Sequence, residues 1–198
     1  MITDAQPLID FISAQLPMLQ DKAREIAGRF EPVGIKKQDL IVTEGKTSEA
    51  YYFLLKGFVR AYTYDLKGKD TTTHFYSGNQ MVGELFSFFK RVPAKENFQA
   101  LTDCQAWRIR FEDLQVAFHS MPEFREFGRA MLVGAYADLK ERMLSMLHLT
   151  AEERYNNLII SSPDIFQHAS LKDIASYLGI TNTSLSRIRK EISKPNAD

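Results

Sequence analysis

The 198-residue chain contains a single cysteine, Cys104. One cysteine excludes an intrachain disulfide framework, and it excludes a cysteine-ligated zinc or iron–sulfur site within one chain. The sequence also lacks an uninterrupted apolar run of about 18 residues, and its N-terminus shows no basic region followed by an apolar stretch. We therefore expect no membrane insertion, no export and a reducing, cytoplasmic location.

The chain has no excess of either charge, because 25 basic residues balance 25 acidic ones. Whole-chain electrostatics thus favour neither nucleic acid nor membrane as a partner, and any basic footprint has to be local. Residues 181–194 provide one, with four cations against one acidic residue. The cations are Arg187, Arg189, Lys190 and Lys194.

The first 110 residues show two different sequence patterns. Residues 7–27 carry apolar side chains at spacings of three and four, which predicts an amphipathic helix that Pro17 kinks or divides. From residue 30 to residue 110, short β-branched and aromatic runs alternate with turn residues, as in a sandwich or barrel. The predicted strands cover residues 40–43, 50–55, 58–64, 71–76, 98–101 and 104–110.

Residues 123–149 form a long helical pattern, equivalent to about 40 Å of helix. A helix of that length exceeds what a small barrel covers, so part of its apolar stripe is expected to pack against a second copy. The alternative is a helix that lies wholly on its own barrel, because Gly128, Gly134 and Asp138 interrupt a regular heptad seam. Thr150 with Glu153 then matches a capping box and begins another helix.

Residues 170–192 carry the pattern of a helix-turn-helix. Ser170 is placed to cap a first helix, Gly179 to take a positive φ at its end, and Thr181 to cap a second helix. The second helix would present polar side chains that suit DNA. We expect base contacts from Asn182, Thr183 and Arg187, and phosphate contacts from Ser184, Arg189, Lys190 and Lys194.

Four segments together resemble the Crp/Fnr superfamily of bacterial transcription regulators. The segment 44–59 resembles the glycine-punctuated barrel hairpin of that family, and 82–85 (Val-Gly-Glu-Leu) resembles the start of its phosphate-binding cassette. Residues 100–104 resemble the strand after the cassette, and 174–188 closely resemble the DNA-binding motif.

The resemblance implies an α+β fold in three parts. It predicts a double-stranded β-helix (jelly-roll-like), cyclic nucleotide-binding-like sensor barrel at residues 1–122, a dimerisation helix at 123–149, and a helical winged-helix-like DNA-binding domain at 150–198. The wing of many relatives is not evident, because the sequence reaches Pro195 shortly after the second helix. The expected partners are double-stranded DNA and a second copy of the chain, with RNA polymerase as a further candidate.

The effector is not predicted by the resemblance. In cyclic-nucleotide-binding relatives a cassette Glu accepts a ribose hydroxyl and a later Arg-Ser or Arg-Thr pair binds the phosphate; here the pair falls on Ala94-Lys95. Lysine does not reproduce an arginine fork, and Arg91 could substitute only if the loop shifts by three residues, so we do not expect cyclic AMP to bind. The candidate pocket residues are Gly83, Glu84, Leu85, Arg91 and Lys95.

No cofactor, metal site or catalytic activity is predicted. Four scattered histidines argue against ligand clusters or a haem, and Gly45-Lys46-Thr47 lacks the first glycine of a P-loop. We expect a dimeric, sequence-specific transcription regulator. The alternatives are a small-molecule-binding barrel with a helical protein-interaction tail and an enzyme on a barrel scaffold, for which no catalytic constellation is present.

Overall fold

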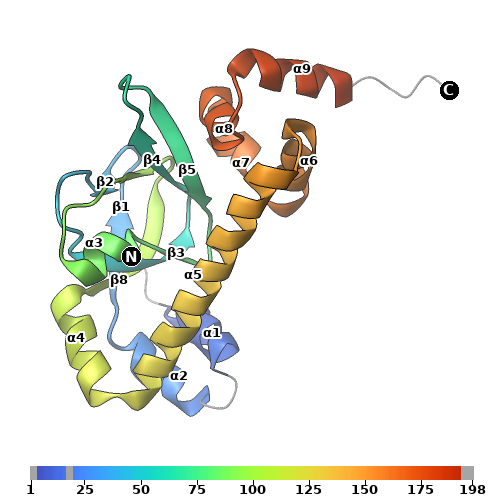
Figure 1. Ribbon diagram of the computed structural model, residues 1–198. Coiled ribbons are helices and arrows are strands. Elements are labelled where there is room, and N and C mark those ends of the chain that lie inside the picture. Colours follow the sequence, from blue (N-terminus) through green and yellow to red (C-terminus); the bar gives the residue numbers. More distant parts are fainter. Residues whose placement is uncertain (1–3, 17–19, 193–198) are drawn as a thin grey trace.

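The computed structural model describes residues 4–16 and 20–192. Within them, the strands form two four-stranded antiparallel sheets, and an all-helical part follows (Figure 1). The strands are β1 (Glu31–Ile35), β2 (Leu40–Val42), β3 (Ala50–Lys56), β4 (Val59–Tyr64), β5 (Asp70–Tyr76), β6 (Gln80–Val82), β7 (Asn97–Ala100) and β8 (Cys104–Arg110). One sheet has the order β1-β8-β3-β6 and the other β2-β7-β4-β5. The predicted α+β class is confirmed, and the described strands form two sheets rather than a closed barrel.

Two of the described helices precede the strands, one lies between β6 and β7, and the others follow the last strand. The helices are α1 (Gln6–Gln15), α2 (Gln20–Ala27), α3 (Leu85–Lys90), α4 (Phe111–Ser120), α5 (Pro122–His148), α6 (Ala151–Ser161), α7 (Ile165–His168), α8 (Leu171–Tyr177) and α9 (Asn182–Ile192). The helix expected at residues 7–27 is divided into α1 and α2, and Pro17 itself lies outside the described residues.

Two apolar clusters build the half of the chain that contains the strands, which is the half expected to be the sensor (the sensor half). Small and β-branched side chains fill the space between the sheets, among them Val59, Ala61 and Ala106. Phe53 and Trp107 of the first sheet instead pack against α1, α2, α4 and the beginning of α5. This second cluster anchors the long helix to the strands.

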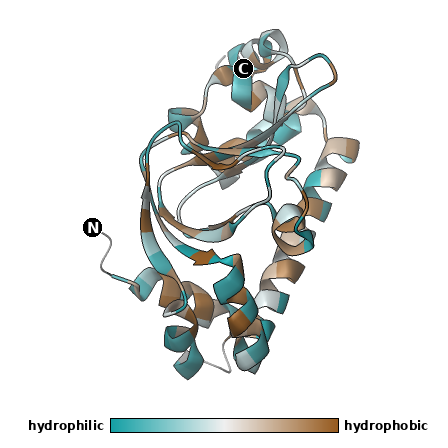
Figure 2. Cartoon of the chain, turned by 90° about the vertical axis from the view of Figure 1, so that its left-hand side faces the viewer, coloured by the Kyte–Doolittle hydropathy of each residue, from teal (hydrophilic) through white to brown (hydrophobic). Residues whose placement is uncertain are grey.

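Helix α5 is buried only near its beginning, at Phe124 and Phe127. Farther along, hydrophobic positions recur on its surface (Figure 2). The predicted long helix is confirmed with bounds one residue earlier, and its apolar stripe extends past the sensor core. The capping box at Thr150 is also confirmed, because its hydroxyl accepts from the Glu153 amide while the Glu153 carboxylate accepts from the Thr150 amide.

Candidate nucleic-acid interface and sensor pocket

Helices α8 and α9 form a helix-turn-helix. Helix α8 begins after Ser170, whose hydroxyl accepts a hydrogen bond from the Asp173 amide at 3.1 Å. The chain then turns at Gly179, whose φ of +69° lies in the left-handed region that glycine adopts without strain. Thr181 begins α9, since its Oγ1 accepts from the Ser184 amide at 3.1 Å. The predicted helix-turn-helix geometry is therefore confirmed.

Helix α9 has one buried face and one exposed face. Leu185 and Ile188 are buried in the core of the C-terminal helices. The exposed polar side chains of α9 include Asn182, Thr183, Ser186, Arg187, Arg189 and Lys190. The helix lies at the opposite end of the molecule from α1 and α2 (Figure 1). This face offers hydrogen-bond donors and positive charge to a large anionic ligand.

The exposed face differs in three details from the sequence prediction. Ser184 is only partly exposed, and its hydroxyl lies 3.0 Å from that of Thr181. Ser186 is exposed but was not predicted as a contact, although it stands four residues from both Asn182 and Lys190 and so shares their side of the helix. The predicted phosphate contact at Lys194 lies outside the described residues.

A groove of about 500 Å³ lies between α6 and α9. It is lined by Tyr155, Ser186, Arg189, Lys190 and Ile192. Its two cationic side chains, Arg189 and Lys190, also belong to the exposed polar face of α9, and their positive charge suits phosphate.

The predicted cassette residues lie at the start of α3. Gly83 is in close contact with Tyr51: a Cβ on Gly83 would lie 2.2 Å from the Tyr51 Cδ2 atom, so the position requires glycine. Glu84 caps α3, because its carboxylate accepts a hydrogen bond from the Ser87 amide. Leu85 is the first residue of the helix. The Glu84 carboxylate is thus engaged within its own loop.

The two cationic candidates point to different partners. Arg91 Nη1 donates to the Ser48 carbonyl at 2.8 Å, and its Nη2 lies 2.6 Å from a carboxylate oxygen of Glu49. The Arg91 guanidinium also lies 4.2 Å from the ring centre of Phe111. Lys95 instead places its ammonium 5.7 Å from the ring centre of Phe86. In this arrangement the Arg91 fork is paired within the protein, and the two cations lie beside different aromatic rings.

A second polar group in the sensor half was not predicted. His74 and Tyr76 of β5 have ring centres 4.4 Å apart. Burial and, to a lesser extent, the positive charge of Arg142 on α5 together lower the pKa of His74 to about 4. Burial raises the pKa of Tyr76 and also that of Glu96, whose pKa the nearby Glu84 carboxylate raises as well. Glu96 and Arg142 come from segments other than β5, so no local motif in the sequence could have identified this group.

The sequence predicted neither a metal site nor a membrane-spanning helix. Across residues 4–16 and 20–192, no group of three His, Cys, Asp or Glu side chains is arranged to hold a metal ion. None of the described helices is both long and apolar enough to cross a membrane. Cys104 is buried at the start of β8, and burial raises the pKa of its thiol.

The chain is similar in sequence to a known domain family and to regulatory proteins of bacteria. The cyclic nucleotide-binding domain family matches residues 32–120. The fumarate and nitrate reduction regulatory protein of Yersinia pestis is 25% identical over 187 residues, which cover 89% of this chain and 73% of that protein. The anaerobic regulatory protein of Haemophilus influenzae is 23% identical over 185 residues, covering 88% and 70% of the two chains.

Among solved structures, FixK2 from Bradyrhizobium japonicum superposes with a TM-score of 0.68 at 20% identity, covering 82% of this chain and 84% of its own. Sheets, long helix and helix-turn-helix thus follow one another here as the sequence resemblance implies, and the relatives that span most of the chain are regulatory proteins. In sequence over most of its length, and in its fold, the chain is therefore similar to transcription regulators of the Crp/Fnr superfamily.

Proposed function

We propose that this chain is a dimeric regulator that binds a specific DNA sequence through α9. The observation that carries the proposal is the exposed polar face of α9, with Arg187 at its centre and Leu185 and Ile188 buried behind it. Arginine makes paired hydrogen bonds to guanine in the major groove, and short polar side chains such as Thr183 reach neighbouring base edges. Asn182 completes the base-contacting set, with Ser184, Arg189, Lys190 and Lys194 at phosphate.

Dimerisation through α5 is the second part of the proposal. Five of the eight exposed large apolar side chains on α5 follow one another in steps of four and three, the spacing of a coiled-coil seam. They are Leu132, Tyr136, Leu139, Met143 and Met146. The seam avoids Gly134 and Asp138, which the sequence suggested as interruptions.

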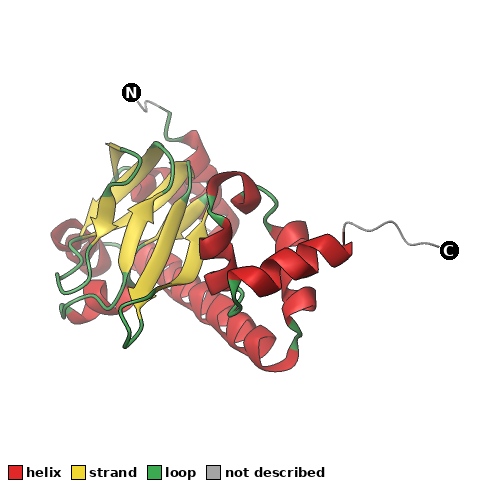
Figure 3. Cartoon of the chain, turned by 90° about the horizontal axis from the view of Figure 1, so that it is seen from above, coloured by secondary structure: helices red, strands yellow, loops and turns green. Residues whose placement is uncertain are grey.

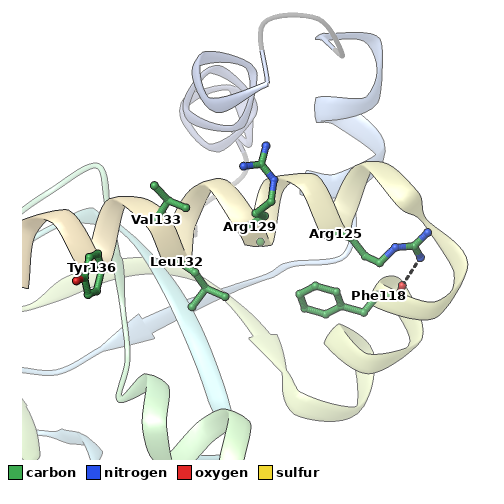
Figure 4. A pocket seen from close by; sticks show the side chains of 7 residues that line it. Phe118, Arg125, Arg129, Leu132, Val133 and Tyr136 are labelled. Atoms are coloured by element: carbon green, nitrogen blue, oxygen red, sulfur yellow. Dashed lines mark hydrogen bonds between the residues drawn. The ribbon is translucent and has the colours of Figure 1, made fainter.

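A groove of about 420 Å³ continues this surface at the beginning of the helix (Figure 4). Phe118 borders it from α4, and Leu132 and Tyr136 border it from α5. Gly128 allows the close approach, because a Cβ there would lie 2.7 Å from the Phe118 Cζ atom. A second copy of α5 would cover both the seam and the groove, and would place two α9 helices on one face of a duplex about one helical turn apart.

The proposal includes no response to cyclic AMP, no resident cofactor and no catalytic activity. Ala94 and Lys95 occupy the positions of the phosphate-binding pair, and the donors of Arg91 are engaged by Glu49 and a backbone carbonyl. Any effector is therefore of another class. The site of action is the cytoplasm, where RNA polymerase is a further candidate partner.

The test is selection of genomic DNA fragments by the purified protein at fixed salt, without added ligand, followed by sequencing. Wild type should select a two-fold symmetric motif, and Arg187→Ala should bind that motif about 10-fold to 100-fold more weakly. Arg24→Ala is the control, because Arg24 is an exposed arginine on α2, at the other end of the molecule. Selection of the same motif with equal affinity by Arg187→Ala would refute the assignment of the contact face.

A further inference from the structure

Helix α8 lies against strand β5 of the sensor half (Figures 1 and 3). Phe75 of β5 meets Tyr177 of α8, with ring centres 5.2 Å apart, and nearby Phe58, just before β4, meets His168 of α7, with ring centres 4.3 Å apart. Phe58 and Phe75 thereby join the apolar cluster that forms the core of the C-terminal helices. The two halves of the chain share part of one interior.

Beside this apolar contact, Arg60 of β4 forms a buried ionic network. Its side chain is only 6% exposed, and its Nη2 lies 3.1 Å from Asp70 Oδ2 on β5. Its Nη1 lies 3.1 Å from Asp173 Oδ1 on α8, and its Nε donates to the Thr72 hydroxyl at 2.7 Å. A buried charge is stable only when it is paired, and Asp173 on α8 supplies one of the two carboxylates that pair with Arg60, so the full pairing of Arg60 depends on α8 at this position.

Two further polar contacts follow the same line along α8. Lys172 Nζ forms an ion pair with Asp70 Oδ1 at 2.9 Å, and the contact with Lys172 is the main cause that lowers the pKa of Asp70. The Thr72 amide donates to Ser176 Oγ at 3.1 Å. The strand edge is therefore bonded to successive turns of the helix.

The other end of α8 is held by arginines of α5 and α6. Arg142 Nη2 donates to the Tyr177 carbonyl at 2.9 Å, and its guanidinium lies 3.7 Å from the Tyr177 ring centre. Arg154 donates through Nε and Nη2 to the Leu178 carbonyl at 3.2 and 3.0 Å. Since α9 follows α8 after a short turn, the direction of α9 depends on how α8 is held.

We propose that Arg60 is a positioning residue for DNA recognition, which acts through Asp173 to fix α8, and with it α9, at one angle to the sensor sheets. This inference rests on the proposed DNA-binding function. The docked arrangement leaves Thr183 and Arg187 exposed. This arrangement is thus compatible with DNA binding. Because α8 and α9 are already fixed in the free protein, less conformational entropy is lost when DNA binds.

The two arginines then act on different properties of recognition. Arg187 acts on the chemistry within one half-site, so its loss weakens binding whatever the separation of the half-sites. Arg60 acts on the angle at which each copy presents α9, so its loss changes how strongly binding depends on that separation. The dependence on separation therefore distinguishes a positioning role from a general loss of folding.

The experiment measures binding of the full chain to the motif selected by wild type, at fixed salt, with the half-sites at the selected separation and one base pair closer or farther. Arg60→Leu should weaken binding at the selected separation about tenfold and leave the other two separations nearly unchanged. Ser176→Ala should act in the same direction with a smaller effect. The control is Arg108→Leu, which removes an arginine paired with Glu31 at 2.7 Å on the other sheet and should bind as wild type does.

A second readout, without DNA, is hydrogen exchange of the α8 amides. Exchange should be at least about tenfold faster in Arg60→Leu than in wild type or Arg108→Leu. Equal losses at all three separations, tighter binding by Arg60→Leu, or unchanged exchange would each overturn the proposal. Ser176→Ala, under the same criteria, decides the matter if Arg60→Leu does not fold. If wild type selects no motif, the proposed DNA-binding function is refuted. Hydrogen exchange of the α8 amides in Arg60→Leu then still tests whether Arg60 holds α8 in place.

Discussion

Acidification should destabilise this protein through one buried imidazole, that of His74. The ordinary pKa of histidine is 6.5, and burial lowers that of His74 to about 4 in the folded chain. Between these values the unfolded chain binds a proton that the folded chain does not. The free energy of unfolding must therefore fall as the pH decreases from about 6.5 toward 4, and His74 contributes no further change below that range.

The size of the effect follows from the two pKa values. Proton linkage gives a loss of about 2 kcal/mol between about pH 7 and pH 5 from this residue alone. The variant His74→Phe keeps a ring beside Tyr76 and removes the titrating group, so its stability should depend less on pH over that range. The measured quantity is the difference in unfolding free energy between variant and wild type, from urea titrations at several pH values.

His119→Gln serves as the control, because His119 is an exposed histidine on α4. It should show the same pH dependence as wild type. Parallel curves for wild type and His74→Phe would refute the reasoning, since they would mean that His74 titrates alike in the folded and unfolded chains.

Two further predictions concern the long helix and the helix that follows it. Leu139→Lys places a charge at a seam position that is 66% exposed in a single chain, and it should reduce the mass measured by sedimentation from twice 22.7 kDa to 22.7 kDa. The control Lys140→Ala should leave the mass unchanged, and an unchanged mass in Leu139→Lys would contradict the seam. Thr150→Ala removes the hydroxyl that accepts from the Glu153 amide at 3.2 Å and should lower the free energy of unfolding in urea by about 1 kcal/mol; a loss near zero would indicate that the cap contributes little.

Periodicity and capping residues predicted the parts of the fold that depend on local sequence. The long helix lies where the apolar spacing predicted it. Thr150, Ser170 and Thr181 were predicted to cap the helices that follow, and they cap α6, α8 and α9. Strands β1 and β6 were not predicted as strands. Both are edge strands, and β1 contains Pro32, which lowers strand propensity but is tolerated at an edge.

The candidate contact face of α9 could be predicted because all of its residues lie on one helix. The contact between Arg60 and Asp173 could not, because 113 positions separate them and only the packing of α8 on β5 brings them together. The same reason hid the surroundings of His74, where β5 and α5 meet. A single sequence indicates which residues share an element, but not which elements share a buried charge.

Phe58 and Phe75, which complete the interior of the C-terminal helices, affect how this architecture can be exchanged between proteins. If helices α6 to α9 were replaced by those of a related protein, Phe58 and Phe75 would face side chains that do not pack closely against them. The replacement would then expose apolar area and leave Arg60 buried without its partner on α8. An exchange of the C-terminal helices between related proteins therefore has to carry the β4–β5 hairpin along with them.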